Sequence, residues 1–102
     1  MKNEKESVTV IANWKMHNDL NSSLDLVIKI FSYCNMVKNV EKIICPPLVN
    51  IIPLYDQFKN STFRLGAQNI NENKEGSYTG ETSINMLKNY ISHAIVGHSE
   101  RR

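Results

Sequence analysis

The sequence predicts an α/β fold in which parallel strands alternate with helices. Short runs of β-branched and other apolar residues alternate with longer segments whose apolar residues recur at helical spacing. The order strand then helix occurs three times, and a fourth strand follows, so we expect right-handed crossovers and parallel strands. A chain of 102 residues is long enough for one small domain and too short for two. We expect that domain at residues 8–102, after a solvated lead-in at residues 1–7.

The first strand is predicted to begin with the β-branched run Val8–Ile11 and to become polar toward Lys15. A helix capped by Asn21 or Ser22 should follow it, since both residue types accept hydrogen bonds from a first helical turn. Apolar residues then recur at helical spacing: Leu24, Val27, Ile28 and Phe31.

The second strand is predicted at Ile43–Cys45. It should stop at Pro46 and Pro47, because proline cannot continue a central ladder. The next helix is expected over Val49–Phe58, with Pro53 early enough in it to be tolerated as a first-turn proline.

The third strand is predicted at Phe63–Ala67, followed by a polar loop over Asn69–Gly80. Ser83 is a candidate cap for a third helix. The apolar residues expected in that helix are Ile84, Leu87 and Ile91. The fourth strand should cover Ala94–Gly97.

Composition argues against several functional classes. The net charge is +2 and the lysines are scattered, whereas a nucleic-acid-binding face needs clustered basic residues. No apolar stretch approaches the roughly 18 residues of a membrane span, and the N-terminus resembles neither a signal peptide nor a transit peptide. Cys34 and Cys45 are too few for a disulfide framework, so we expect both to pack in the core as thiols.

Candidate chemistry lies where the first and fourth strands end. Side chains alternate along a strand, so Asn13 and Lys15 should share one face of the first strand. In the same way, Ala94, Val96 and His98 should share one face of the fourth strand. If these faces coincide, an amide, an ammonium and an imidazole converge above one sheet edge. Such a pair suits a small, negatively charged carbonyl substrate, because lysine binds anions and neutral histidine donates to a developing oxyanion. The alternative is that Lys15 and His98 are ordinary solvated residues.

Other motifs are weak. His17 and His93 lack metal-ligand spacing with any Cys, Asp or Glu, so no metal site is expected. The glycines of residues 76–80 lack the lysine of a phosphate-binding loop, and no serine nucleophile elbow is present. Ser99 is a candidate cap for a short terminal helix.

Five motifs together resemble a known family. They are Asn13-Trp14-Lys15-Met16, Ile44-Cys45-Pro46-Pro47, Leu65-Gly66-Ala67-Gln68-Asn69, Tyr78-Thr79-Gly80-Glu81 and Gly97-His98-Ser99-Glu100-Arg101-Arg102. Their order and spacing resemble the triosephosphate isomerase family from Val8 onward. The resemblance implies a (β/α)₈ TIM barrel, of which this chain carries the first three βα units and the fourth strand.

The resemblance also implies an activity: interconversion of dihydroxyacetone phosphate and glyceraldehyde 3-phosphate through an enediolate, without a cofactor. His98 would be the neutral electrophile. Lys15 would supply positive charge to the phosphate and the enediolate, and Asn13 would help to bind substrate. Ser99 and Glu100 would support the site from behind.

Further implications concern partners and location. The loop at residues 71–79 resembles the family's dimer-interface loop, with Thr79 reaching toward the neighbouring subunit. Glu81 and Arg101 would make ionic contacts across that interface. A cytoplasmic homodimer acting in glycolysis and gluconeogenesis is expected.

A complete barrel needs about 250 residues, and the family's glutamate base, lid and later phosphate-binding loops lie downstream of these motifs. We therefore expect no turnover from the 102 residues alone, and we expect them to self-associate through an open sheet edge. The alternatives are an inactive truncated half-barrel or interaction fragment, and, more distantly, another barrel that handles phosphosugars.

Overall fold

The computed structural model describes residues 8–34 and 37–101, and only the backbone of Arg101. Its strands are β1 (Val8–Asn13), β2 (Val40–Cys45), β3 (Phe63–Ala67) and β4 (His93–Ala94). Its helices are α1 (Leu20–Cys34), α2 (Leu48–Lys59), the single turn α3 (Ile84–Leu87) and the 3₁₀ helix η2 (Ser99–Arg101). The strands form one parallel sheet in the order β1-β2-β3-β4. The predicted α/β alternation and parallel sheet are confirmed, and the lead-in expected at residues 1–7 lies outside the described residues.

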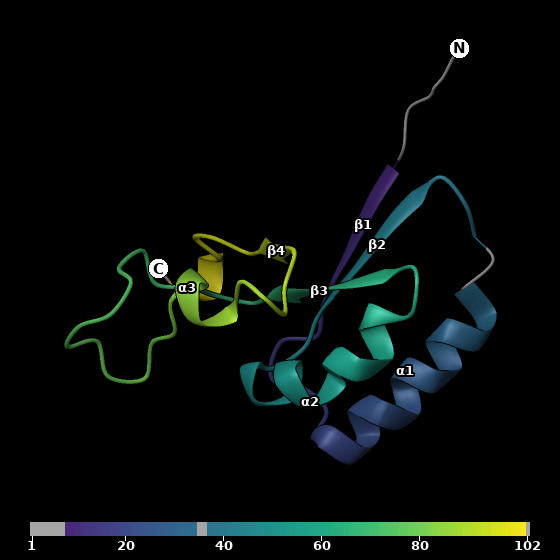
Figure 1. Ribbon diagram of the computed structural model, residues 1–102, viewed down its shortest axis with the longest axis horizontal. Coiled ribbons are helices and arrows are strands. Elements are labelled where there is room, and N and C mark those ends of the chain that lie inside the picture. The colour runs from purple at the N-terminus through teal and green to yellow at the C-terminus, as the bar shows by residue number, and fades with distance from the viewer. Residues whose placement is uncertain (1–7, 35–36, 102) are drawn as a thin grey trace, which may run out of the picture.

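The core lies between the sheet and two helices. In Figure 1, α1 and α2 lie side by side below the sheet, on one of its faces. Core side chains come from both layers and, at Leu87, from α3: Val27, Ile44, Ile51, Leu54, Phe58, Phe63, Leu65, Ala67 and Leu87. Phe31 of α1 joins them, stacked on Phe63 at 4.7 Å and edge-on to Phe58 at 5.2 Å between ring centroids. This packing holds β2 and β3, the two middle strands of the sheet, against the helices.

Helix α1 begins earlier than predicted, and its cap is Asp19 rather than Asn21 or Ser22. The Ser22 backbone N–H donates to Asp19 Oδ1 at 2.9 Å, and the Ser22 hydroxyl donates to the same oxygen at 3.0 Å. These bonds, the backbone one foremost, lower the pKa of the Asp19 carboxyl below its ordinary value of 3.8. The prediction was wrong because Asn21 and Ser22 tolerate the first helical turn once an aspartate precedes them.

Two later elements also differ from the prediction. Helix α2 begins at Leu48, so Pro53 lies in its second turn, not its first. Ser83 does cap α3, accepting from the Met86 backbone N–H at 3.3 Å, but the helix ends at Leu87 and excludes Ile91.

The cysteines behave as core residues. Cys34 is partly buried, Cys45 is buried, and neither forms a disulfide. Burial raises the pKa of the Cys45 thiol to about 11, so the protonated, unreactive form prevails at neutral pH. Across residues 8–34 and 37–101, every helix is too short or too polar to cross a lipid bilayer.

Candidate active site at the carboxyl ends of the strands

Lys15 reaches the site through a turn, not through strand alternation. Strand β1 ends at Asn13, and the Trp14 N–H still donates to the Cys45 carbonyl of β2 at 3.0 Å. The chain then turns at Lys15, which has a φ of 55°. Asn13 Oδ1 accepts the Lys15 backbone N–H at 2.9 Å and closes this turn. The predicted neighbours do meet, but the predicted reason was wrong because Lys15 lies outside the strand.

His98 also lies beyond its strand. Strand β4 covers only His93–Ala94, rather than the predicted Ala94–Gly97. Pairing extends one residue further, as the Ile95 N–H donates to the Ala67 carbonyl at 2.9 Å. Gly97, with a φ of 68°, then redirects the chain, so alternation along the strand does not place His98. A left-handed φ of this kind suits glycine because it has no Cβ.

The two turns bring their side chains to one hollow. Lys15 Nζ lies 2.7 Å from Glu100 Oε2, an ion pair that joins the ends of β1 and β4 across 85 residues of sequence. The hollow, of about 560 Å³, is lined by Asn13, Lys15, Met16, His17, Gln68, His98 and Glu100. Four of the predicted site residues thus converge, whereas Ser99 starts η2 and does not line the hollow.

The surroundings of His98 Nδ1 bear on which ring nitrogen carries the proton. The Glu100 backbone N–H donates to Nδ1 at 3.3 Å, and Glu100 Oε1 lies 3.0 Å from the same nitrogen. The N–H requires a lone pair at Nδ1, whereas the carboxylate requires a proton there. The two contacts therefore favour opposite tautomers of the neutral ring, and they do not assign the proton to one nitrogen.

The charge of Glu100 depends on Lys15. The hydrogen bond from the Lys15 ammonium lowers the pKa of the Glu100 carboxyl below its ordinary value of 4.5, with smaller Coulombic help from Lys15 and His98. Because the folded-state pKa is the lower one, the ion pair's contribution to stability is present above pH 4.5 and is lost as the pH falls through the folded value.

We expect Lys15→Met to raise the pKa of Glu100 back toward its ordinary value, because the main cause of the shift is removed. A ¹³C NMR titration of the Glu100 carboxyl measures this directly. Lys88→Met, a change at an exposed lysine outside the hollow, is the control and should leave the Glu100 titration unchanged. A Glu100 carboxyl that titrates alike in the parent and Lys15→Met chains would contradict the pairing.

Gln68 is a residue of the site to which the sequence reasoning gave no role. Its Nε2 donates to the Lys15 carbonyl at 2.7 Å and to the Cys45 carbonyl at 2.9 Å. It therefore ties the turn that carries Lys15 to the end of β2. Gln68 directly follows β3, so the signal that singled out Lys15, a polar residue just after a strand, also marked Gln68.

Comparison with known proteins identifies the family of the chain. The sequence model of the family described as triosephosphate isomerase matches residues 8–102. The chain belongs to the triosephosphate isomerase family. A triosephosphate isomerase of Dehalococcoides mccartyi strain BAV1 is 40% identical over 95 residues, which are 93% of this chain and 38% of that protein. Those of Buchnera aphidicola from Baizongia pistaciae and of Psychromonas ingrahamii are each 38% identical, covering 91% of this chain and 38% of theirs.

The chain thus spans well under half the length of these triosephosphate isomerases. Its parallel four-stranded sheet with alternating helices is part of a TIM barrel, as the resemblance implied. In complete barrels the site sits at the carboxyl ends of the strands, and that is the end at which the hollow with Lys15 and His98 lies.

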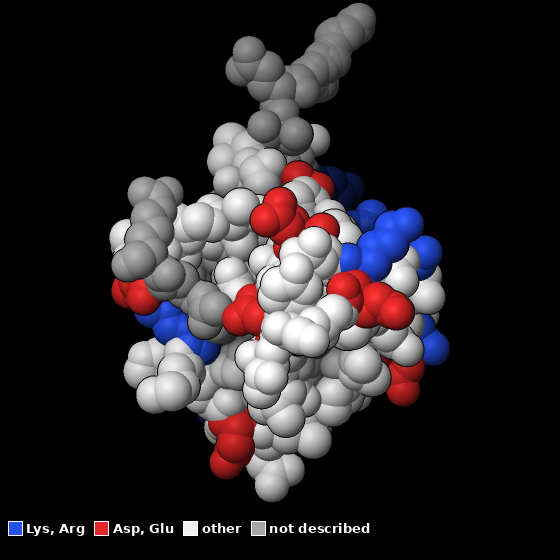
Figure 2. Space-filling view, turned by 90° about the vertical axis from the view of Figure 1, so that its left-hand side faces the viewer, with Lys and Arg blue, Asp and Glu red and all other residues white. Residues whose placement is uncertain are grey.

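The loop that resembles the isomerase dimer interface projects away from the sheet (Figure 1). Its base is closed by the Asn71 N–H, which donates to the Thr82 carbonyl at 2.8 Å. Thr79 is exposed, and Glu81 is partly buried, 3.4 Å from Asn69 Nδ2. On the side of the molecule shown in Figure 2, acidic side chains are scattered across the whole face, and basic ones lie toward its left and right edges. The Arg101 side chain lies outside the described residues.

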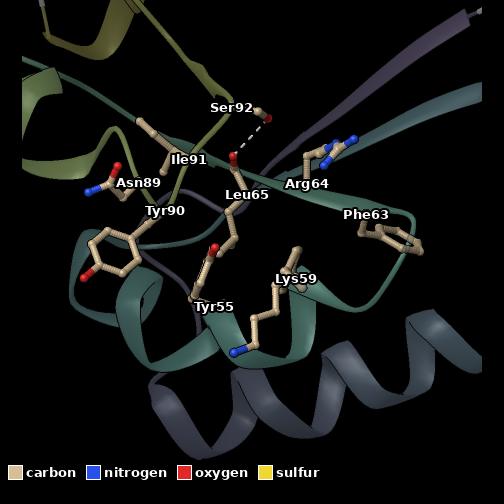
Figure 3. A pocket seen from close by; sticks show the side chains of 10 residues that line it. Tyr55, Lys59, Phe63, Arg64, Leu65, Asn89, Tyr90, Ile91 and Ser92 are labelled. Carbon is tan, nitrogen blue, oxygen red and sulfur yellow. Dashed lines mark hydrogen bonds between the residues drawn. The ribbon is translucent and has the colours of Figure 1, made fainter.

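A second hollow, of about 230 Å³, lies away from the strands' carboxyl ends, between α2, β3 and the segment before β4. Figure 3 shows Tyr55 and Tyr90 edge to face across it, and Ser92 Oγ donates to the Leu65 carbonyl at 3.4 Å. Lys59 lies over the Tyr55 ring and pairs with Asp56 at 3.2 Å. These side chains contact one another or nearby groups, so this hollow does not present a group of reactive side chains to a ligand. Among the described residues, no three His, Cys, Asp or Glu side chains gather as metal ligands would.

Proposed function

We propose that this chain supplies the phosphate-binding lysine and the electrophilic histidine of a triosephosphate isomerase site. One observation carries the proposal: Lys15, Glu100 and His98 form a connected polar group within one hollow at the strands' carboxyl ends. The family match supports it with the identity of the substrate, a triose phosphate.

Each residue has a role that follows from its chemistry. The Lys15 ammonium, held by Glu100, is a cation for the substrate phosphate and for negative charge that develops during enolisation. His98 donates a hydrogen bond from its ring N–H to the substrate carbonyl oxygen as that oxygen becomes an oxyanion, the role that the family resemblance implies. Asn13, which also lines the hollow, contributes to substrate binding and shapes the Lys15 turn. Glu100 and Ser99 support these groups from the first turn after Gly97.

Proton abstraction from substrate carbon needs a base, and none of these residues is assigned to it. Glu100, the carboxylate of the hollow, is engaged by Lys15 and has a lowered pKa, which makes it a weak base. We propose that the 102 residues alone bind substrate without turning it over. The family resemblance implies that the base comes from barrel sequence downstream of the five motifs.

The partner and cellular context follow from the family and are part of the proposal. The projecting loop, with Thr79 exposed and Glu81 at its base, suits a homodimer contact in which Arg101 takes part. An isomerase of this kind acts in glycolysis and gluconeogenesis in the cytoplasm.

A chimera tests the assigned roles. Residues 8–102 replace the matched segment of the Dehalococcoides isomerase, and a coupled assay measures kcat and KM. We expect an active chimera in which His98→Ala lowers kcat by about 100-fold or more and Lys15→Met raises KM sharply. Lys88→Met, outside the hollow, is the control. A folded, active chimera that is insensitive to both site changes would overturn the assignment.

An interaction fragment is the second candidate, and exposed apolar residues favour it. Val8, Val10 and Ile11 of β1 are each about half exposed or more, and so is Val96. Strand β1 lies at an edge of the four-stranded sheet, and unpaired edges favour association. Analytical ultracentrifugation of the 102-residue chain tests for this association. We expect oligomers whose proportion rises with concentration. A monodisperse monomer at all concentrations would argue against association.

A further inference from the structure

The loop between β1 and α1 holds two non-glycine residues in left-handed conformations. The φ angles are 55° at Lys15 and 74° at Asn18. Such residues persist where the surrounding structure enforces them, and they concentrate at functional sites. Hydrogen bonds from Lys15 N to Asn13 and from Gln68 to Lys15 O enforce the first. The second needs a restraint of its own.

That restraint comes from Asn50 in the first turn of α2. Its Nδ2 donates to the Asn18 carbonyl at 2.9 Å and to Ser23 Oγ at 3.1 Å. Asn50 is only 1% exposed. Burying an amide costs free energy unless it is hydrogen-bonded, and the other buried α2 residues, Ile51, Leu54 and Phe58, are apolar. Packing alone therefore gives no reason for an amide at this position.

The segment between the two strained residues has little support of its own. Met16 is 93% exposed and His17 is also exposed. The loop is therefore held near its ends, at Lys15 by Asn13 and Gln68 and at Asn18 by Asn50. Release of the Asn18 end would leave the exposed residues free and Lys15 held by Asn13 and Gln68 alone.

We propose that Asn50 is a positioning residue for Lys15, acting through the Asn18 carbonyl from outside the substrate hollow. The part that concerns loop geometry stands on the contacts above. The part that concerns ligand affinity rests on the proposed function, because it assigns Lys15 to the substrate phosphate.

The chain contains a built-in reporter of this loop. Trp14 is its single tryptophan and directly precedes Lys15. In Asn50→Leu, which keeps similar bulk but has no donor, we expect stronger quenching of Trp14 fluorescence by acrylamide. We also expect affinity for dihydroxyacetone phosphate, followed by the same fluorescence, to fall roughly tenfold. The matched control is Asn60→Leu, at the exposed end of α2, which should change neither quantity.

A second substitution separates positioning from packing. Asn18→Gly makes the left-handed φ inexpensive, so in the Asn50→Leu background it should restore Trp14 protection and part of the lost affinity. A packing defect at Asn50 would not respond to a change in the loop. If Asn50→Leu fails to fold, recovery of the far-UV circular dichroism spectrum by Asn18→Gly supports the proposal and continued failure overturns it.

Two further outcomes are decisive. Parent-like quenching and affinity in Asn50→Leu overturn the proposal, and so does a defect that Asn18→Gly leaves unchanged. If Trp14 becomes more accessible in Asn50→Leu but the parent chain binds no dihydroxyacetone phosphate, the positioning of the loop stands and the proposed function fails.

Discussion

Gly66→Ala should disrupt both the sheet and the candidate site. A Cβ at Gly66 would lie 2.6 Å from Cys45 Sγ and 3.2 Å from the His93 carbonyl oxygen. The first distance is shorter than real contacts allow, and both neighbours are held: Cys45 is 1% exposed and His93 pairs with Gly66 in the sheet. Overpacking of this kind costs about 1–3 kcal/mol.

The damage should spread to Lys15 because the Cys45 carbonyl accepts from both Trp14 N and Gln68 Nε2. A displaced Cys45 therefore loosens the turn that Gln68 holds. We expect a lower melting temperature together with a rise in the Glu100 pKa, measured by circular dichroism and by NMR titration. Adding Cys45→Ala to Gly66→Ala removes the 2.6 Å contact. The double variant should recover most of the lost melting temperature, and its Glu100 pKa should return most of the way to the parent value. A Gly66→Ala chain as stable as its parent would show that the sheet has room for a Cβ between Gly66 and Cys45.

Leu54→Ala should remove a large share of the chain's free energy of unfolding. Leu54 is fully buried in α2 and belongs to the core that joins the helices to β2 and β3. Truncation of a buried leucine typically costs about 2.7–5 kcal/mol, because transfer energy is lost and a cavity remains. Small domains have about 5–15 kcal/mol in total, so the folded state should become marginal.

Urea unfolding, followed by circular dichroism, measures this loss. Ile52→Ala is the matched control, because Ile52 lies on the same helix but is 53% exposed, and surface changes usually stay within about 0.5 kcal/mol. Equal shifts of the urea midpoint in Leu54→Ala and Ile52→Ala would mean that α2 does not pack as described.

The sequence was sufficient to predict the alternation of strands and helices and the family, because apolar spacing and five ordered motifs are local signals. It was also sufficient to predict that Asn13, Lys15, His98 and Glu100 lie near one another, and all four line one hollow. It was not sufficient to show how they meet. Strand alternation was the wrong explanation, since both Lys15 and His98 lie beyond their strands. Lys15 itself has a left-handed φ, and His98 follows the left-handed Gly97.

The residues that hold the site were harder to predict. Gln68 and Asn50 act on backbone carbonyls 53 and 32 residues away in sequence. No local pattern records such a contact, because only tertiary packing brings α2 and β3 against the β1–α1 loop. The C-terminal end of strand β4 was predicted too late in the chain. Ile95 and Val96 have high strand propensity, but the strand ends at Ala94 and the chain turns at Gly97.

The most direct test of the proposed triose phosphate site at the ends of β1 and β4 is a titration of Trp14 fluorescence with dihydroxyacetone phosphate. The protein is kept dilute to limit association, and dihydroxyacetone, which lacks the phosphate, is the matched control ligand. We predict a saturable change for the phosphorylated ligand alone, lost in Lys15→Met and weakened in His98→Ala. No saturable change in the parent chain, or unchanged affinity in Lys15→Met, would contradict the assignment of this site.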